Sequence, residues 1–121
     1  MIEIRQVLHP YLLSLHARTY FQQAPDNAAM PYLVYNFVNI LDDGQGHQLL
    51  TLDIDGWDNA DDTTPLEALM SQVEVGLDKH VLVGTGAVIS VYLDNKIPLL
   101  EDDQKIHRRK YVFQGRVFKR G

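Results

Sequence analysis

Two neighbouring segments with the pattern of paired β-strands constrain the fold of this chain most strongly. Residues Pro31 to Leu41, PYLVYNFVNIL, are rich in β-branched and aromatic residues and place apolar groups on both faces. Such a segment is typical of a central strand that is covered on both sides. Asp43 and Gly44, followed by Gly46, then predict a hairpin turn, because these residue types tolerate positive φ.

The return strand of this hairpin is predicted from about Gln48 to Trp57. Its alternation indicates a sheet with one buried side and one solvated side. The apolar side carries Leu50, Leu52 and Ile54, and the other side, which becomes acidic toward its end, carries Leu49, Thr51, Asp53 and Asp55.

An amphipathic helix is predicted before the hairpin. Apolar residues recur there at a spacing of three to four, from Ile4 to Leu15. Pro10 lies inside this segment and should kink the helix or divide it at His9. A short strand is a further possibility near Arg18 to Phe21.

The second helix has the clearest local signal in the chain. Thr64 offers a hydroxyl for the N-cap, Pro65 suits the first helical position, and Glu67 stands at the third. The helix should end near Lys79. Its predicted buried stripe consists of Leu66, Leu69, Met70, Val73 and Leu77.

Two more strands complete the predicted fold. The first runs from Ala87 to Asp94 and the last from about Arg108 to Lys119, with a link over Asn95 to His107 between them. At 121 residues the chain is long enough to bury a core as a single domain over 1–121. The predicted fold class is α+β, a mostly antiparallel sheet of about four strands with two helices packed on one face.

Charge is sorted by position along the chain. All sixteen acidic residues lie at or before Asp103, and seven of the eleven Lys and Arg lie after it. Residues 1–103 therefore carry a formal −12 and the last eighteen carry +7, which together give the net −5. One interpretation is that copies of the chain attract one another head to tail. The other is that the basic end pairs with acids of its own body.

The sequence offers weak candidates for catalysis. The five His residues form no H-E-x-x-H arrangement, and no Ser lies in a G-x-S-x-G elbow. The chain has no Cys, which excludes disulfides, thiolate metal sites and Cys nucleophiles. We therefore expect no catalytic residues, no metal ligands and no cofactor. No apolar stretch reaches the ~18 residues that span a bilayer, and we expect no membrane partner.

The densest carboxylate cluster comprises Asp53, Asp55, Asp58, Asp61 and Asp62. Close carboxylates can bind a divalent cation. The spacing fails the EF-hand pattern, because the sixth position counted from Asp53 is Asp58 and not Gly. A solvated strand end or an interface explains the cluster more simply.

The last strand interleaves bases with aromatic residues in RRKYVFQGRVFKR. That mixture can bind single-stranded nucleic acid by stacking and phosphate contacts, so a small nucleic-acid-binding module is an alternative function. It is also what a strand looks like when one face is buried and its ends are charged. The negative net charge is opposite to the usual nucleic-acid footprint, and we do not expect nucleic acid as the main partner. Trp57 either caps the core or anchors a subunit contact.

The order of these elements resembles the tail-terminator and tail-to-head joining (tail completion) proteins of long-tailed bacteriophages and prophages. The resemblance covers about Ile2 to Phe118. It is carried by the element order and by two segments, Met30 to Tyr35 with the Pro-led strand PYLVY and Thr51 to Leu77 with the capped helix. No active-site motif takes part in it.

The resemblance implies a structural virion protein that forms a ring, commonly of six copies, at the head-proximal end of the tail tube. Such a ring ends tube polymerisation and joins the tail to the head. The implied partners are further copies of the chain, the tail tube protein and the head connector protein. The implied location is the neck region of the virion tail, after synthesis in the host cytoplasm.

The charge pattern suggests which residues would form the contact between copies. We expect the acidic cluster of one copy to meet the basic closing strand of its neighbour through complementary potentials. We also expect a loop over 95–107 that is mobile in the free subunit and ordered on assembly. The candidate interface residues are Asp53, Asp55, Asp58, Asp61, Asp62, Arg108, Arg109, Lys110, Arg116 and Lys119.

Overall fold

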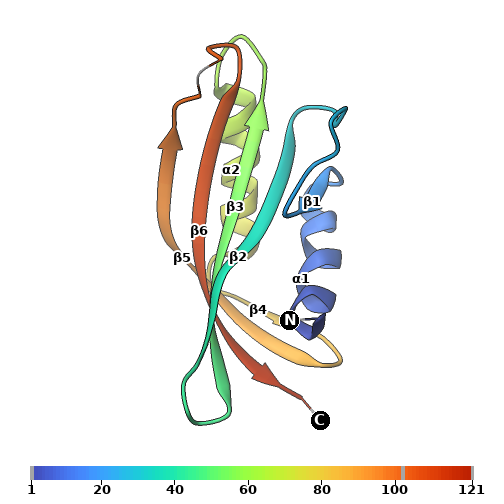
Figure 1. The fold of residues 1–121 in the computed structure, drawn as a ribbon, viewed down its shortest axis with the longest axis vertical. Helices are drawn as coiled ribbons and strands as arrows, with labels where there is room; N and C mark the ends of the chain where they lie inside the picture. The colour runs from blue at the N-terminus through green and yellow to red at the C-terminus, as the bar shows by residue number, and fades with distance from the viewer. Residues whose placement is uncertain (1, 102, 121) are drawn as a thin grey trace.

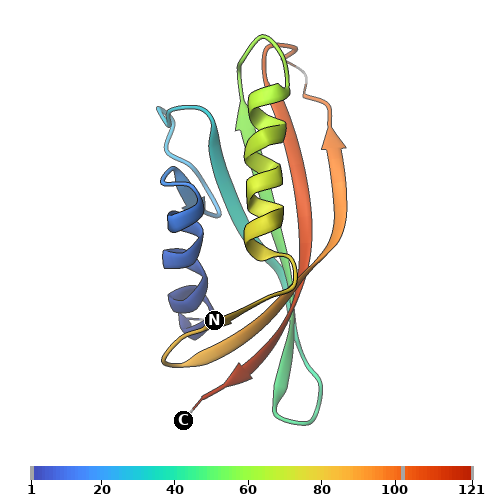
Figure 2. The same ribbon diagram turned by 180° about the vertical axis from the view of Figure 1, so that it is seen from behind.

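The computed structural model describes residues 2–101 and 103–120. Two helices cover one face of a six-stranded sheet (Figures 1 and 2). The predicted α+β class and the placement of both helices on one face are confirmed. In chain order the elements are α1 (Ile2–Leu15), β1 (Thr19–Phe21), β2 (Tyr32–Asp42), β3 (His47–Asp58), α2 (Thr64–Leu77), β4 (His80–Val83), β5 (Ala87–Leu99) and β6 (His107–Lys119).

The strands lie in the order β1-β2-β3-β6-β5-β4. All neighbours are antiparallel except β1, which pairs parallel with β2. The sequence-based count of about four strands was wrong. The two outermost strands have only three and four residues, too few to show an alternating pattern of their own.

Strand β5 is longer than predicted. It continues past Asp94 to Leu99, and residues 95–99 pair with β6. A register shift between Leu93 and Asn95 changes the phase at which β5 residues alternate between the two faces. The alternating pattern in the sequence is therefore interrupted at Asp94. The expected 95–107 loop is therefore confined to residues between Leu99 and His107, of which residue 102 lies outside the described chain, and the mobility of the loop stays a prediction.

Both helices differ in detail from expectation. Helix α1 runs unbroken through Pro10, so the expected division at His9 was wrong; the proline is exposed, while neighbouring turns bury Ile4, Leu8 and Leu12 in the core. Helix α2 has Thr63 at its N-cap and no side-chain cap bond. Instead the Asp62 carboxylate accepts a hydrogen bond from the Thr64 amide at 2.8 Å.

The core lies between the helices and one face of the sheet. The predicted stripe of α2 is buried in full, and Leu50, Leu52 and Ile54 of β3 face it as expected. The hairpin turn is also confirmed: Gly44 and Gly46 have positive φ, at 79° and 86°.

The expectation that β2 is covered on both sides was wrong. Its helix-side residues Leu33 and Tyr35 are buried, but Val38 and Leu41 are each 55% exposed. The sheet has a second face that no element of the described chain covers, and we call it the open face. It carries five of the ten candidate interface residues: Asp53, Asp55, Arg108, Lys110 and Arg116.

Candidate interaction surface

Strands β3 and β6 bring acidic and basic residues together on the open face. The two strands are direct neighbours and run antiparallel, and their register sets Asp55 opposite Lys110 and Trp57 opposite Arg108. Opposed residues in an antiparallel pair share one face of the sheet. The acidic end of β3 therefore lies beside the basic start of β6, and we call Asp53, Asp55, Arg108 and Lys110 the ion-pair cluster.

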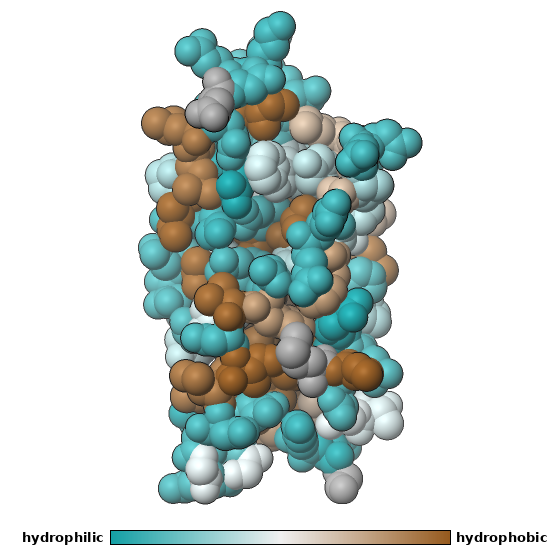
Figure 3. All heavy atoms as spheres, in the orientation of Figure 1, coloured by the Kyte–Doolittle hydropathy of each residue, from teal (hydrophilic) through white to brown (hydrophobic). Residues whose placement is uncertain are grey.

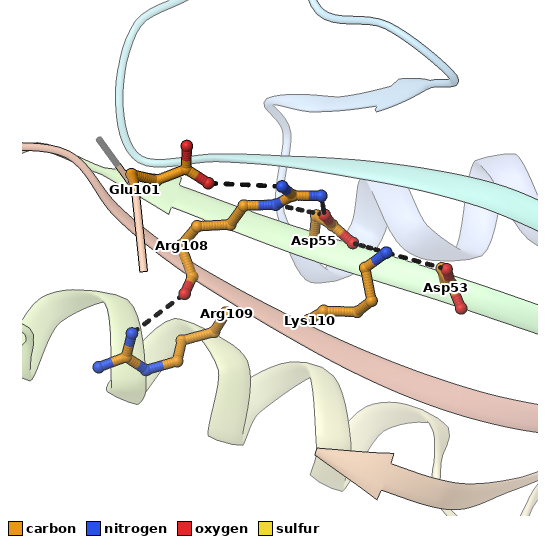
Figure 4. A network of polar contacts seen from close by, with 6 residues as sticks. All are labelled: Asp53, Asp55, Glu101, Arg108, Arg109 and Lys110. Atoms are coloured by element: carbon orange, nitrogen blue, oxygen red, sulfur yellow. Dashed lines mark hydrogen bonds and ion pairs between the residues drawn. The ribbon is translucent and has the colours of Figure 1, made fainter. Parts of the chain in front are cut away.

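Arg108 and Asp55 form the centre of this cluster (Figure 4). The guanidinium donates from Nε to Asp55 Oδ2 at 2.7 Å and from Nη2 to the same oxygen. Asp55 is 6% exposed, so its carboxylate depends on this partner in place of water.

The remaining contacts extend the cluster along both strands. Lys110 Nζ donates to Asp53 Oδ2 at 3.2 Å and lies 3.9 Å from Asp55 Oδ1. Arg108 Nη1 reaches Glu101 Oε1 at 3.4 Å, which ties the loop between β5 and β6 to the sheet (Figure 4). Each charge of the cluster thus has an opposite charge of the same chain.

Burial and pairing act against each other at this site. Burial raises the pKa of Asp55 above its ordinary value, and the hydrogen bond and charge of Arg108 oppose that shift without cancelling it. Burial acts to lower the pKa of Arg108, but the contacts with Asp55 and Glu101 outweigh it and raise that pKa. The arginine therefore stays charged, and Asp55 relies on it to remain ionised.

Trp57 belongs to the open face and not to the core. Its ring stacks on Tyr32 with centroids 6.3 Å apart and an interplanar angle of 19°, and Arg108 Cζ lies 4.6 Å from its centroid. Together with residues 22–24 these groups border a cavity of about 330 Å³ above the ion-pair cluster. Of the two roles considered for Trp57, capping the core is excluded by its place on this face.

The other acidic candidates lie apart from the ion-pair cluster. Asp58 is 4% exposed; its Oδ1 accepts the Asn59 amide at 2.9 Å, and its Oδ2 has no partner among the described residues. Asp61 and Asp62 lie exposed in the loop before α2. Within the described chain, no group of three or more His, Cys, Asp or Glu is placed to hold a metal ion.

The remaining basic candidates are divided between the two faces and the two ends of β6. Arg109 points to the helix side, where its Nη2 lies 3.4 Å from Glu67 Oε1. Arg116 and Lys119 lie at the far end of the strand and are exposed. Neither has a salt bridge to any residue that the structure describes.

The sequence analysis missed an apolar surface around Arg116. Five exposed hydrophobic side chains occupy the open face at that end of the sheet. The signal available in the sequence was the placement of Leu49 on the face opposite to Leu50, Leu52 and Ile54. We call these five residues the apolar patch: Leu41, Leu49, Val81, Val83 and Tyr92.

The five histidines have structural partners. Each ring nitrogen contact is to a carbonyl, a carboxylate or a hydroxyl of the protein, at 2.7–3.2 Å. Among the described residues, no helix has the length and apolar character that crossing a membrane requires.

Comparison with known proteins gives a match in fold alone. Neither known family profiles nor curated protein sequences match this chain. A solved structure described as the virion of a native gene transfer agent particle contains a similar chain, with a TM-score of 0.73 and 17% sequence identity. The similarity covers 98% of the present chain and 93% of the other, so the whole fold is shared and not one motif of it.

Proposed function

We propose that this protein is a structural component of a phage-type virion. In this proposal it forms a ring, of six copies as in the family that the sequence resembles, at the head-proximal end of a tail. The ring ends polymerisation of the tail tube and joins the tail to the head connector.

The observation that carries the proposal is the fold shared over nearly the full length with a chain of a gene transfer agent virion. The sequence resemblance to tail-completion proteins points to the same class of particle from independent evidence. At 17% identity the structural match establishes fold, and the role in the particle is our inference from both observations.

The open face supports an assembly role. A sheet with helices on one side leaves its other side to solvent or to a partner. Here that side carries the exposed apolar patch, and exposed hydrophobic side chains gathered on one face of a small protein favour an interaction site. Structural virion proteins work through such contacts with identical and different subunits.

The nucleic-acid alternative loses support from the ion pairs. Arg108, Arg109 and Lys110 are the densest bases of the tail, and each faces a carboxylate of the same chain. Binding phosphate at these positions would require breaking those pairs. Lys105, Arg116, Lys119 and Arg120 remain as exposed bases, fewer than a typical nucleic-acid footprint uses.

Native mass spectrometry across a salt series tests the proposal, with and without purified tail tubes. We expect discrete oligomers, or a monomer that assembles only on tubes, with assembly weakening at high salt because exposed charges are screened. A protein that stays monomeric in every condition, tubes included, would contradict the proposed function. A band shift with single-stranded nucleic acid that declines steeply with salt would favour the alternative.

A further inference from the structure

Three residues of the apolar patch lie in one row across the sheet, with Leu41 and Leu49 at one end, Val81 at the other, and Arg116 and Ser90 between them. The pairing of strands sets Leu41 opposite Leu49, Leu49 opposite Arg116, Arg116 opposite Ser90, and Ser90 opposite Val81. These five positions share the open face and span β2, β3, β6, β5 and β4. Figure 3 shows this face, with apolar residues across the lower part of the molecule among polar ones.

A hollow lies within this row. It has a volume of about 250 Å³ and is lined by Leu49, Ser90, Tyr92, Gln114, Gly115 and Arg116. Leu49 and Tyr92 give it apolar walls and Ser90 and Gln114 polar ones. Arg116, which has no salt bridge to a described residue, places a positive charge at its edge. The hollow can therefore take an apolar side chain that is followed or preceded by a carboxylate, with Leu49 and the Tyr92 ring against the apolar part and Arg116 near the carboxylate.

The chain carries such a side chain at its opposite end. Leu100 is 100% exposed, in the loop after β5, and the next three residues in sequence are Glu, Asp and Asp. Figure 1 shows this loop at one end of the long axis and the β2–β3 hairpin with the end of β6 at the other. Leu100 and the hollow therefore cannot meet within one molecule.

The charges of the two ends are complementary. The end that carries Leu100 also carries Asp61, Asp62 and Asp103 beside Lys105, a net negative set. The end near the hollow carries Arg116, Lys119 and Arg120 beside Asp42 and Asp43, a net positive set. Opposite potentials of this kind steer two molecules into one relative orientation. They favour the Leu100 end of one copy at the hollow of another over contacts between like ends.

We propose that Leu100 of one copy inserts into the hollow beside Arg116 of a second copy, with the acids next to Leu100 close to that arginine. The inference rests on the proposed function in requiring that copies associate. It specifies a heterologous contact, in which the Leu100 end of each copy binds the hollow of the next copy. Repetition of such a contact closes into a ring or continues as a filament.

Cysteine cross-linking tests the contact directly, since the natural chain has no cysteine. Leu100→Cys and Ser90→Cys are prepared as separate full-length proteins, mixed and oxidised, and analysed by mass spectrometry. We expect a disulfide between the two different variants and little within either variant alone. Val75→Cys on the outer face of α2, where Val75 is 76% exposed, is the matched control for an exposed cysteine.

Substitution gives an independent measurement. Leu100→Ser should weaken association roughly tenfold to a hundredfold, the effect of losing one buried leucine. Arg116→Glu should also weaken it, and Val75→Ser should not. Thermal unfolding of the monomers should be alike in all three, because these side chains are exposed in the free molecule.

The outcomes separate this inference from the proposed function. A ring seen by native mass spectrometry with no mixed disulfide would overturn the Leu100 contact and leave the proposed function standing. A strong disulfide within Ser90→Cys alone would also overturn it, because that result indicates a two-fold contact of patch on patch. Absence of any oligomer, with and without tubes, would overturn both.

Discussion

The two halves of the open face are built from the same strands but differ in how their arginines are paired. At one end of β6, Arg108 meets Asp55 and Glu101, and its side chain is 27% exposed. At the other end Arg116 is exposed, has no salt bridge to a described residue, and stands among hydrophobic side chains. Two arginines on one face of one strand thus differ: Arg108 takes part in internal structure, and Arg116 is the one that we propose contacts a partner.

This contrast between Arg108 and Arg116 shows that the number of charges in a segment does not locate an interface. The basic tail looked uniform in sequence, and two interpretations were open for it, attraction between copies and pairing with acids of its own body. The structure supports the second interpretation for Arg108 and Lys110, which pair with acids of their own body. Whether the ion-pair cluster also touches a neighbour stays a prediction, since it lies on the same open face.

The largest effect expected from this comparison is on stability. Arg108→Ala should lower the free energy of unfolding by about 2–4 kcal/mol, because it leaves Asp55 buried without its partner. Arg116→Ala, the same change on the same strand, should alter it by less than about 0.5 kcal/mol. Urea unfolding of both variants measures the contrast, and equal values would remove the distinction between the two halves.

Packing beneath the two halves should differ as well. A Cβ added at Gly56 would lie 2.5 Å from Met70 Sδ and 2.9 Å from Leu66 Cδ1, so Gly56→Ala should cost about 1–3 kcal/mol of stability. At Gly115 the nearest atom would be Ile89 Cγ2 at 3.2 Å, and Gly115→Ala should cost less. Thermal unfolding compares the stability of the two variants. A larger loss of stability for Gly115→Ala than for Gly56→Ala would contradict the close packing of α2 against β3 at Gly56.

Hydrogen exchange can sharpen the comparison at the loop between β5 and β6. Amides of residues 100, 101 and 103–106 should exchange rapidly in the monomer and slow on assembly, while the non-proline residues of 95–99 should be protected in both states by pairing with β6. Strong and equal protection of residues 100, 101 and 103–106 in monomer and ring would contradict the predicted ordering of this loop.

The smallest expected effect concerns pH. Because burial raises the pKa of Asp55 above 3.8, its protonated form is favoured by folding. The stability that this provides is present below pH 3.8 and is lost as pH rises through the raised pKa. Exposed Asp43 has the opposite sign, since hydrogen bonds from the Gln45 and His47 amides lower its pKa. NMR titration of the two carboxyl groups should show these opposite shifts.

Long elements with a regular pattern were predictable from sequence. The hairpin, the buried stripe of α2 and the last strand were all found within a few residues of their actual bounds. Strands β1 and β4 were missed or uncertain because packing, and not local preference, forms elements this short. The end of β5 was missed because its register shift interrupts the alternation.

The candidate site was only partly predictable, for a different reason. The sequence identified the charged residues, but which charge meets which depends on β3 and β6 being neighbours, and these strands are separated by α2, β4 and β5 in the chain. The apolar patch draws on four strands, β2, β3, β4 and β5, so no single segment shows it. A surface formed by residues from distant segments leaves no recognisable pattern in any one stretch of the sequence.

The pairing of β3 with β6 continues without interruption from His47 to Asp58, whereas β2 and β5 each contain a register shift. An inserted or deleted residue in either central strand would turn every later side chain to the opposite face, carrying carboxylates and guanidinium groups into the core and leucines into water. Length changes in this protein should therefore accumulate in its loops and outer strands. The central pair should keep a fixed length even in distant relatives whose side chains have all changed.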